Sequence, residues 1–178
     1  GEGFPTVVFE AGLGNGKEVW GSVFAAVSRK AHAIAYDRAG YGKSEPSALP
    51  RDGLQLVQEL RALLQAENCL PPYVLVGHSL GGTLVKLFAR SYPHEVAGVV
   101  LVDARHSDFA KRCDQLGVHR YLYQPPAALF MWAKATLRGE LRAAKLTLKQ
   151  ARQAGPFPAV PLIVLTQRRA AMRWPLGL

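Results

Sequence analysis

Short apolar runs alternate with helical stretches along this chain, and that alternation restricts the possible fold more than any other feature. Strands joined by helices pair in parallel, because each crossover helix returns the chain to the end of the sheet where the previous strand began. We therefore predict an α/β fold of three layers, with a mostly parallel sheet and helices on both faces. The predicted strands are Thr6–Glu10, Ala31–Tyr36, Tyr73–Val76, Val96–Val102 and Pro161–Thr166.

Helical spacing fills the intervals between these strands. Residues 17–29 carry one apolar stripe, and a second helix should begin near Asp52, where Gln55 completes a pattern resembling a capping box. Residues 82–92 form the third predicted helix, and the basic stretch 109–153 is helical by the same spacing. In the second helix Val57, Leu60 and Leu64 are expected to point inward. The stripe of residues 17–29 is Val19, Trp20, Val23, Phe24 and Val27, and the stripe of the basic stretch is Leu137, Leu141, Ala144, Leu148 and Ala151.

The length of 178 residues fits one domain with a single core. The formal charge is +9, and much of the excess lies between Lys111 and Gly155, where nine basic residues face only Asp114 and Glu140. A basic face confined to one segment is usually a solvated surface, although a partner could also bind there. We expect no nucleic-acid partner.

Cysteine usage and hydropathy bear on the compartment. Cys69 and Cys113 are far apart and lie outside any metal-ligand spacing, so we expect free thiols in a reducing environment, with a disulfide as the alternative. No apolar run approaches the roughly eighteen residues of a membrane span. The first residues resemble no secretory leader. These observations favour a cytoplasmic protein.

The pentapeptide Gly77-His78-Ser79-Leu80-Gly81 has the form G-x-S-x-G and lies between an expected strand and an expected helix. The glycines on either side let the strand and the helix approach closely, while the serine occupies a sharp, strained turn. With 17 glycines and seven serines in the chain, composition alone predicts about 0.06 such matches. A plain serine in a glycine-rich turn is therefore the weaker interpretation. The pattern predicts Ser79 as a nucleophile.

Acyl chemistry at a serine also needs hydrogen-bond donors for the developing oxyanion. The backbone N–H of Leu80, at the start of the helix, is one candidate donor. A second could come from the glycine-rich turn after the first strand, at Leu13. That turn could equally be a plain connection, but its pairing with Ser79 favours the functional interpretation.

Three stretches together resemble the α/β-hydrolase superfamily, and within it the bacterial esterase-like and lipase-like members. They are Pro5–Gly14, the turn Asp37–Ser44 and the elbow Val76–Gly82. The resemblance implies Ser79 as nucleophile, the N–H groups of Leu13 and Leu80 as the oxyanion hole, and a structural role for the Asp37–Ser44 turn. It also implies an incomplete hydrolase core over 1–107 and 156–178, with a helical cap at 108–155.

A catalytic triad needs an acid and then a histidine after the nucleophile. In the family the histidine follows the last strand, but residues 167–178 contain no Asp, Glu or His. The family's first hairpin has no counterpart before Thr6 either, so the core looks trimmed at both ends. Asp103 ends the strand after the nucleophile helix and could supply the acid, or could simply cap or face solvent. His106, three residues later, is our hypothesis for the base, and His119 is another candidate on the same segment.

The residues thus support a serine hydrolase that acts on carboxylic esters with small to medium acyl chains. The alternative is an inactive relic or binding module, and acyl transfer or peroxidase-like chemistry would use the same site. No nucleotide, flavin or metal motif is visible, so we expect no cofactor and no metal. An exposed edge at Pro161–Thr166 would favour homo-oligomers, because unpaired strand edges pair with other chains.

Overall fold

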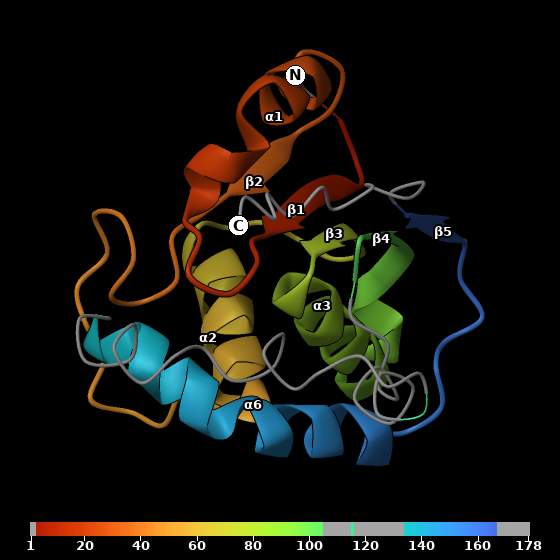
Figure 1. Ribbon diagram of the computed structural model, residues 1–178. Coiled ribbons are helices and arrows are strands. Elements are labelled where there is room, and N and C mark those ends of the chain that lie inside the picture. Colours follow the sequence, from red (N-terminus) through yellow and green to blue (C-terminus); the bar gives the residue numbers. More distant parts are fainter. Residues whose placement is uncertain (1–2, 105–114, 116–133, 167–178) are drawn as a thin grey trace, which may run out of the picture.

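The structure is a computed structural model and describes residues 3–104, 115 and 134–166. A five-stranded, wholly parallel sheet has the strand order β2-β1-β3-β4-β5. Helix α1 lies on one face of this sheet, and α2 and α3 lie on the other (Figure 1). The predicted parallel α/β architecture is confirmed. The strands are β1 (Thr6–Glu10), β2 (Ala33–Ala35), β3 (Tyr73–His78), β4 (Val96–Val102) and β5 (Leu162–Leu165).

Alternating side chains of the central strands enter two separate apolar clusters. Val8 and Leu75 pack against α2 (Gly53–Ala66) and α3 (Leu80–Ser91), whereas Phe9 and Val76 pack with Trp20 on the opposite face. Successive strand residues point to opposite faces, so each strand supplies both layers. Such burial on both faces is typical of a parallel sheet and explains the nearly continuous apolar runs.

Helix α2 begins as the sequence predicts. The Asp52 carboxylate accepts hydrogen bonds from the backbone N–H groups of Leu54 and Gln55, at 3.1 and 3.4 Å. The Gln55 amide does not complete a reciprocal box, because its nitrogen donates to Glu59 at 3.4 Å. The predicted inward face is confirmed, since Val57, Leu60 and Leu64 are all buried.

The predicted helix at 17–29 is a 3₁₀ turn, η1 (Lys17–Trp20), followed by α1 (Gly21–Ser28). Of the expected stripe, Trp20 is buried and Phe24 and Val27 pack against the core. Val19 and Val23 are 45% and 53% exposed, so these two members of the stripe do not face the core. The change from 3₁₀ to α winding at Trp20 explains the difference, because it alters which residues share a face.

Helix α6 (Ala135–Gln153) packs across α2 and α3 (Figure 1). Its fully buried residues are polar: Thr136, Glu140 and Thr147. The predicted stripe is only half-buried. A stripe of leucine and alanine therefore did not mark the buried face correctly, because an ion pair and close backbone contacts occupy it. Helix α6 is the part of the expected 108–155 cap that the structure describes at length.

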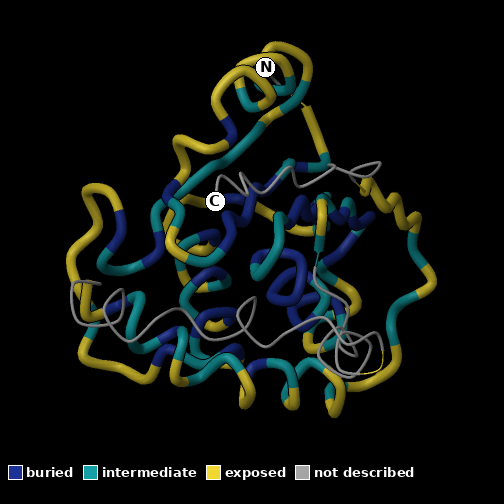
Figure 2. The backbone as a smooth tube through the Cα atoms, in the orientation of Figure 1, coloured by how far each residue is buried: buried dark blue, intermediate teal, exposed yellow. Residues whose placement is uncertain are grey.

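Strand β5 is exposed on both faces (Figure 2), and each of its four residues is between 49% and 56% exposed. It lies at the end of the strand order. Cys69 is a free, buried thiol, and burial raises its pKa. Cys113 lies outside the described residues. No helix in the described part of the chain is both long and apolar enough to cross a bilayer.

Candidate active site

Ser79 occupies the turn between β3 and α3 in a conformation that few L-residues adopt. Its φ is 52° and its ψ is −113°, although it is not a glycine. Its backbone N–H donates to the Val102 carbonyl oxygen at 3.1 Å, and its own carbonyl accepts from Gly82 N at 3.1 Å. Strain of this kind persists only when the surroundings enforce it, and it is concentrated at functional sites.

The two glycines of the pentapeptide explain how this turn is enforced. A Cβ on Gly77 would lie 2.5 Å from the Gly81 carbonyl oxygen, so β3 and α3 touch through bare backbone. A Cβ on Gly81 would lie 2.1 Å from the carbonyl oxygen of Glu10, at the end of β1. The predicted close approach of strand and helix is therefore present. The elbow also presses directly on the start of the glycine-rich turn.

That glycine-rich turn, Ala11–Gly14, connects β1 to η1 and contains Leu13. Gly12 accepts a hydrogen bond from Asn15 N at 3.3 Å, which closes the turn. Gly14 has a φ of 78°, which suits a residue without a Cβ. Leu13 and Leu80 are both half-buried. The predicted oxyanion donors thus belong to two backbone segments that meet where Gly81 touches Glu10 and Ala11.

Asp103 immediately follows β4 at the carboxyl edge of the sheet. Val102 pairs with His78 in the strand register, so Asp103 and Ser79 are the next residues along two neighbouring strands. Asp103 is exposed and has a φ of 43°. Its N–H donates to the Leu165 carbonyl oxygen at 2.9 Å. The sequence-based placement of an acid at the same edge as the nucleophile agrees with this register.

The three described histidines have other surroundings. His32 is exposed and shares a 3.0 Å hydrogen bond with the Thr6 hydroxyl, at the opposite end of β1. His94 is exposed in the short turn η2 (Pro93–Glu95) after α3. The His78 ring lies against Gly12 and edge-on to Trp20. The proposed base His106, and also His119, lie outside the described residues.

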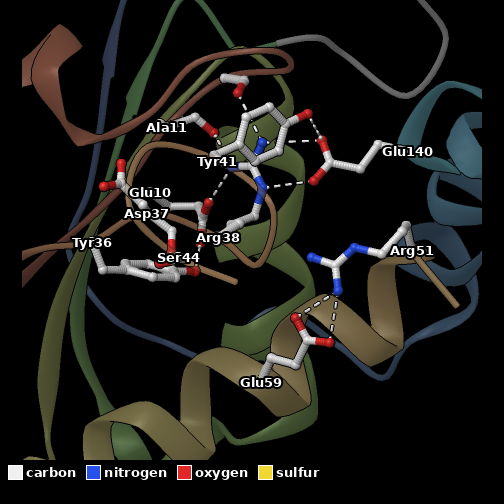
Figure 3. A network of polar contacts seen from close by, with 11 residues as sticks. Glu10, Ala11, Tyr36, Asp37, Arg38, Tyr41, Ser44, Arg51, Glu59 and Glu140 are labelled. Carbon is white, nitrogen blue, oxygen red and sulfur yellow. Dashed lines mark hydrogen bonds and ion pairs between the residues drawn. The ribbon is translucent and has the colours of Figure 1, made fainter. Parts of the chain in front are cut away.

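A buried ionic network lies beside the glycine-rich turn, and the sequence analysis did not identify it (Figure 3). The Arg38 guanidinium donates to Glu10 Oε1 at 2.6 Å and to Glu140 Oε1 and Oε2 at 2.9 and 3.1 Å. The Tyr36 hydroxyl donates to Glu10, and the Tyr41 hydroxyl donates to Glu140 at 3.0 Å. Two signals in the sequence could have suggested it. They are the arginine of the Asp37–Ser44 turn and the single acidic residue in the 115–155 stretch.

The network also holds the glycine-rich turn itself. Arg38 Nη1 donates to the Ala11 carbonyl oxygen at 2.8 Å, and Nη2 donates to the Gly12 carbonyl oxygen at 2.9 Å. All five guanidinium contacts are internal, and the Arg38 side chain is only 2% exposed. The Asp37–Ser44 turn therefore supplies, through Arg38, hydrogen bonds that hold the glycine-rich turn, in addition to the structural role expected of it.

Burial and mutual charge shift the ionisation of these groups. Burial raises the pKa of Glu10, although Arg38 and the Tyr36 hydroxyl oppose the shift. Burial opposes the charge of Arg38, but Glu10 and Glu140 outweigh it and raise its pKa further above the usual range. Burial and the neighbouring Glu140 raise the pKa of Tyr41 to about 12. The tyrosines thus remain hydrogen-bond donors at neutral pH.

Comparison with known proteins identifies the family to which the chain is similar. Residues 5–158 match the family described as the alpha/beta hydrolase fold. The chain is 41% identical over 105 residues to the uncharacterized protein YqjL of Bacillus subtilis, a match that covers 59% of this chain and 42% of that protein. It is 29% identical over 102 residues to the monoacylglycerol lipase ABHD6 of Rattus norvegicus, covering 55% of this chain and 30% of that one.

Among solved structures, the esterase EaEST of Exiguobacterium antarcticum superposes with a TM-score of 0.63 at 16% identity, covering 89% of this chain and 72% of that one. This similarity concerns the fold alone. The chain spans less than half the length of both curated relatives. The matched residues include the elbow, the glycine-rich turn and Asp103. The chain belongs to the α/β-hydrolase fold family.

Proposed function

We propose that the protein is a serine hydrolase that cleaves carboxylic esters of small to medium acyl chain length, through an acyl-enzyme on Ser79. The observation that carries the proposal is the strained backbone of Ser79, held by glycines that leave no room for a Cβ. A strained serine at a strand-to-helix turn is costly for stability and has a known use, which is to expose a nucleophilic hydroxyl. The similarity to a monoacylglycerol lipase in sequence and to an esterase in fold supports the ester class.

The chemistry proceeds in two steps. Ser79 Oγ attacks the ester carbonyl carbon while a base accepts its proton, and collapse of the tetrahedral intermediate releases the alcohol, which takes up that proton. Water then attacks the acyl-enzyme and regenerates Ser79. The N–H groups of Leu13 and Leu80 stabilise the oxyanion in both steps.

The general base and its acid partner complete the proposed site. Asp103 lies next to Ser79 in the register of adjacent strands, and His106 follows it by three residues in the sequence. We propose Asp103 as the acid that orients the base and His106 as that base. Substitution of His106 by alanine should then lower ester turnover in a folded protein, whereas unchanged turnover would exclude it.

The test of the main proposal is hydrolysis of a short-chain p-nitrophenyl ester by the purified chain beside Ser79→Ala. Turnover that disappears in the variant supports the proposal. A fluorophosphonate probe, which phosphonylates activated serines, should label the wild type and leave Ser79→Ala unlabelled. Equal ester hydrolysis by both proteins, or neither turnover nor labelling, would contradict it.

A binding module without catalysis is the second candidate. It is favoured by the placement of the three described histidines, of which His32 and His94 are exposed and His78 lies against Gly12 and Trp20. A serine that keeps its oxyanion donors but has no base retains only weak catalysis. Ester binding without turnover, in a chain that folds normally, would support this candidate.

We further propose that the chain self-associates through β5. All four β5 residues are apolar and about half exposed, and β5 ends the described sheet. An apolar strand edge of this kind forms hydrogen bonds with another strand when one is available. Sedimentation velocity over a range of protein concentrations measures this directly.

A further inference from the structure

The Arg38 network touches the peptide that carries the proposed oxyanion donor. Nη2 of Arg38 holds the Gly12 carbonyl oxygen at 2.9 Å. That carbonyl and the N–H of Leu13 belong to the same peptide unit, which is trans. In a trans peptide the C=O and the N–H point in opposite directions within one rigid plane. Fixing the direction of the Gly12 carbonyl therefore fixes the direction of the Leu13 N–H.

A single hydrogen bond would leave the Gly12–Leu13 peptide free to tilt, but Arg38 makes a second hydrogen bond to the peptide before it. Its Nη1 also holds the preceding carbonyl, that of Ala11, at 2.8 Å. The planar guanidinium thus clamps two successive carbonyl groups in a geometry set by its fork. A lysine at this position could not reproduce the pair of contacts, because its ammonium is a single point.

The guanidinium is itself oriented by α6. Glu140 accepts from Arg38 Nε and Nη2 at 2.9 and 3.1 Å, and it is 2% exposed. The first turns of α6 make further contacts with the same region. Thr136 packs against Gly40, and the Leu137 side chain lies 3.7 Å from the position of a Cβ on Gly14. The first turns of α6 thus contact both Arg38 and the glycine-rich turn, and Figure 3 shows Glu140 facing the Arg38 guanidinium.

We propose that Arg38 is a positioning residue for the oxyanion hole, and that Glu140 couples the docking of α6 to the orientation of the Leu13 N–H. The proposal rests on the proposed function, because it assumes that the Leu13 N–H serves the oxyanion. Its consequence is that the first turns of α6, which lie outside the sheet, influence stabilisation of the transition state. Substrate binding, which does not depend on that N–H, should be largely unaffected.

The test compares Glu140→Gln and Arg38→Lys with a control that removes a contact at the opposite end of α6. Gln150 also joins α6 to α2, since its amide nitrogen donates to Asp52 at 2.8 Å and its oxygen accepts from Leu54 N at 3.1 Å. Its hydrogen bonds are thus made to the start of α2, away from Arg38 and the glycine-rich turn. Gln150→Leu therefore removes a contact of the last turn of α6 and leaves the contacts of its first turns with Arg38 and the glycine-rich turn in place.

We expect Glu140→Gln and Arg38→Lys to lower kcat on a p-nitrophenyl ester by about tenfold or more, with KM within about twofold of wild type. Gln150→Leu should keep both constants within about twofold. Loss of a whole oxyanion donor costs about 10²-fold or more in kcat, so a misdirected donor should cost less. If Glu140→Gln does not fold, Tyr41→Phe removes one hydrogen bond to Glu140 and should give a smaller loss of the same kind.

A second readout does not depend on turnover. The amide ¹H–¹⁵N resonance of Leu13 should shift in Arg38→Lys and Glu140→Gln and remain in place in Gln150→Leu. The inference is overturned if the folded clamp variants keep wild-type kcat and an unmoved Leu13 amide, or if Gln150→Leu loses as much activity as Glu140→Gln. Absence of any wild-type turnover and labelling would contradict the proposed function instead, and the amide comparison would still decide whether the clamp orients Leu13.

Discussion

The Arg38 guanidinium donates to the carbonyl oxygen of Gly12 at 2.9 Å, one peptide bond from the N–H of Leu13. The two residues are 26 positions apart in the sequence and lie on different turns. The same arginine is paired with Glu10 of β1 and Glu140 of α6. One buried side chain therefore connects the first strand, the glycine-rich turn and the last described helix.

Gly81→Ala should strongly destabilise the fold. The added Cβ would meet the Glu10 carbonyl oxygen at 2.1 Å, and backbone atoms cannot yield as a flexible side chain does. We expect a loss of about 2–4 kcal/mol in the free energy of unfolding, or failure to fold. Urea denaturation measures the loss. Gly98→Ala in β4 is the control, because its Cβ would make only ordinary contacts, the nearest at 3.5 Å, and should change stability by less than about 1 kcal/mol. Similar losses for both variants would contradict the close-packed elbow.

Ser79→Gly should be more stable than Ser79→Ala, while both lack serine chemistry. A residue with φ near 52° is strained unless it is glycine. Relief of that strain should exceed the extra backbone freedom of glycine in the unfolded chain, for a net gain of about 1 kcal/mol. The Ser79 side chain makes no capping hydrogen bond to α3, so the comparison is not complicated by a lost cap. Thermal unfolding of the two variants side by side checks this, and equal stabilities would mean that the elbow carries no such strain.

Glu10 should make stability depend on pH in a defined direction. Burial raises its pKa above the usual 4.5 in the folded protein. The unfolded chain therefore loses this proton first as pH rises, which favours unfolding. The contribution of protonated Glu10 to the free energy of unfolding is fully present below a pH of about 4.5, and it is lost as pH rises through the folded-state pKa. In Glu10→Gln this dependence is absent, so the stability of wild type relative to the variant should fall as pH rises. Urea titrations at several pH values measure the difference, and a difference that grows with pH would show that the sign is wrong.

Ile163→Lys should reduce self-association. Ile163 is central in β5 and 54% exposed. A lysine on an edge strand opposes pairing with another chain, because the incoming strand would have to desolvate the charge. The wild type should sediment increasingly as a dimer or larger species as concentration rises, and the variant should remain smaller. Val19→Lys, on the exposed face of η1, is a control that adds the same charge away from the edge. A wild type that stays monomeric at high concentration would refute the proposal.

The sequence by itself determined which segments form strands and helices, the parallel architecture and the position of the elbow. These depend on local physics: apolar runs of strand length, glycines where backbones touch, and the cap at Asp52. The apolar stripes of residues 17–29 and of α6 did not by themselves mark the buried faces, because winding and packing partners, rather than periodicity, decide which face is buried.

The tertiary structure alone decided what surrounds and holds the glycine-rich turn. The buried network joins residues that are far apart in the sequence, since Arg38 and Glu140 form an ion pair across 102 positions. Taken singly, each member of the network is an ordinary charged residue. Charged side chains are buried only when they find partners of opposite sign, and those partners are brought together by the fold rather than by spacing along the chain. The sequence thus placed the serine and its neighbouring glycines, whereas only the folded chain placed the clamp that holds the turn beside them.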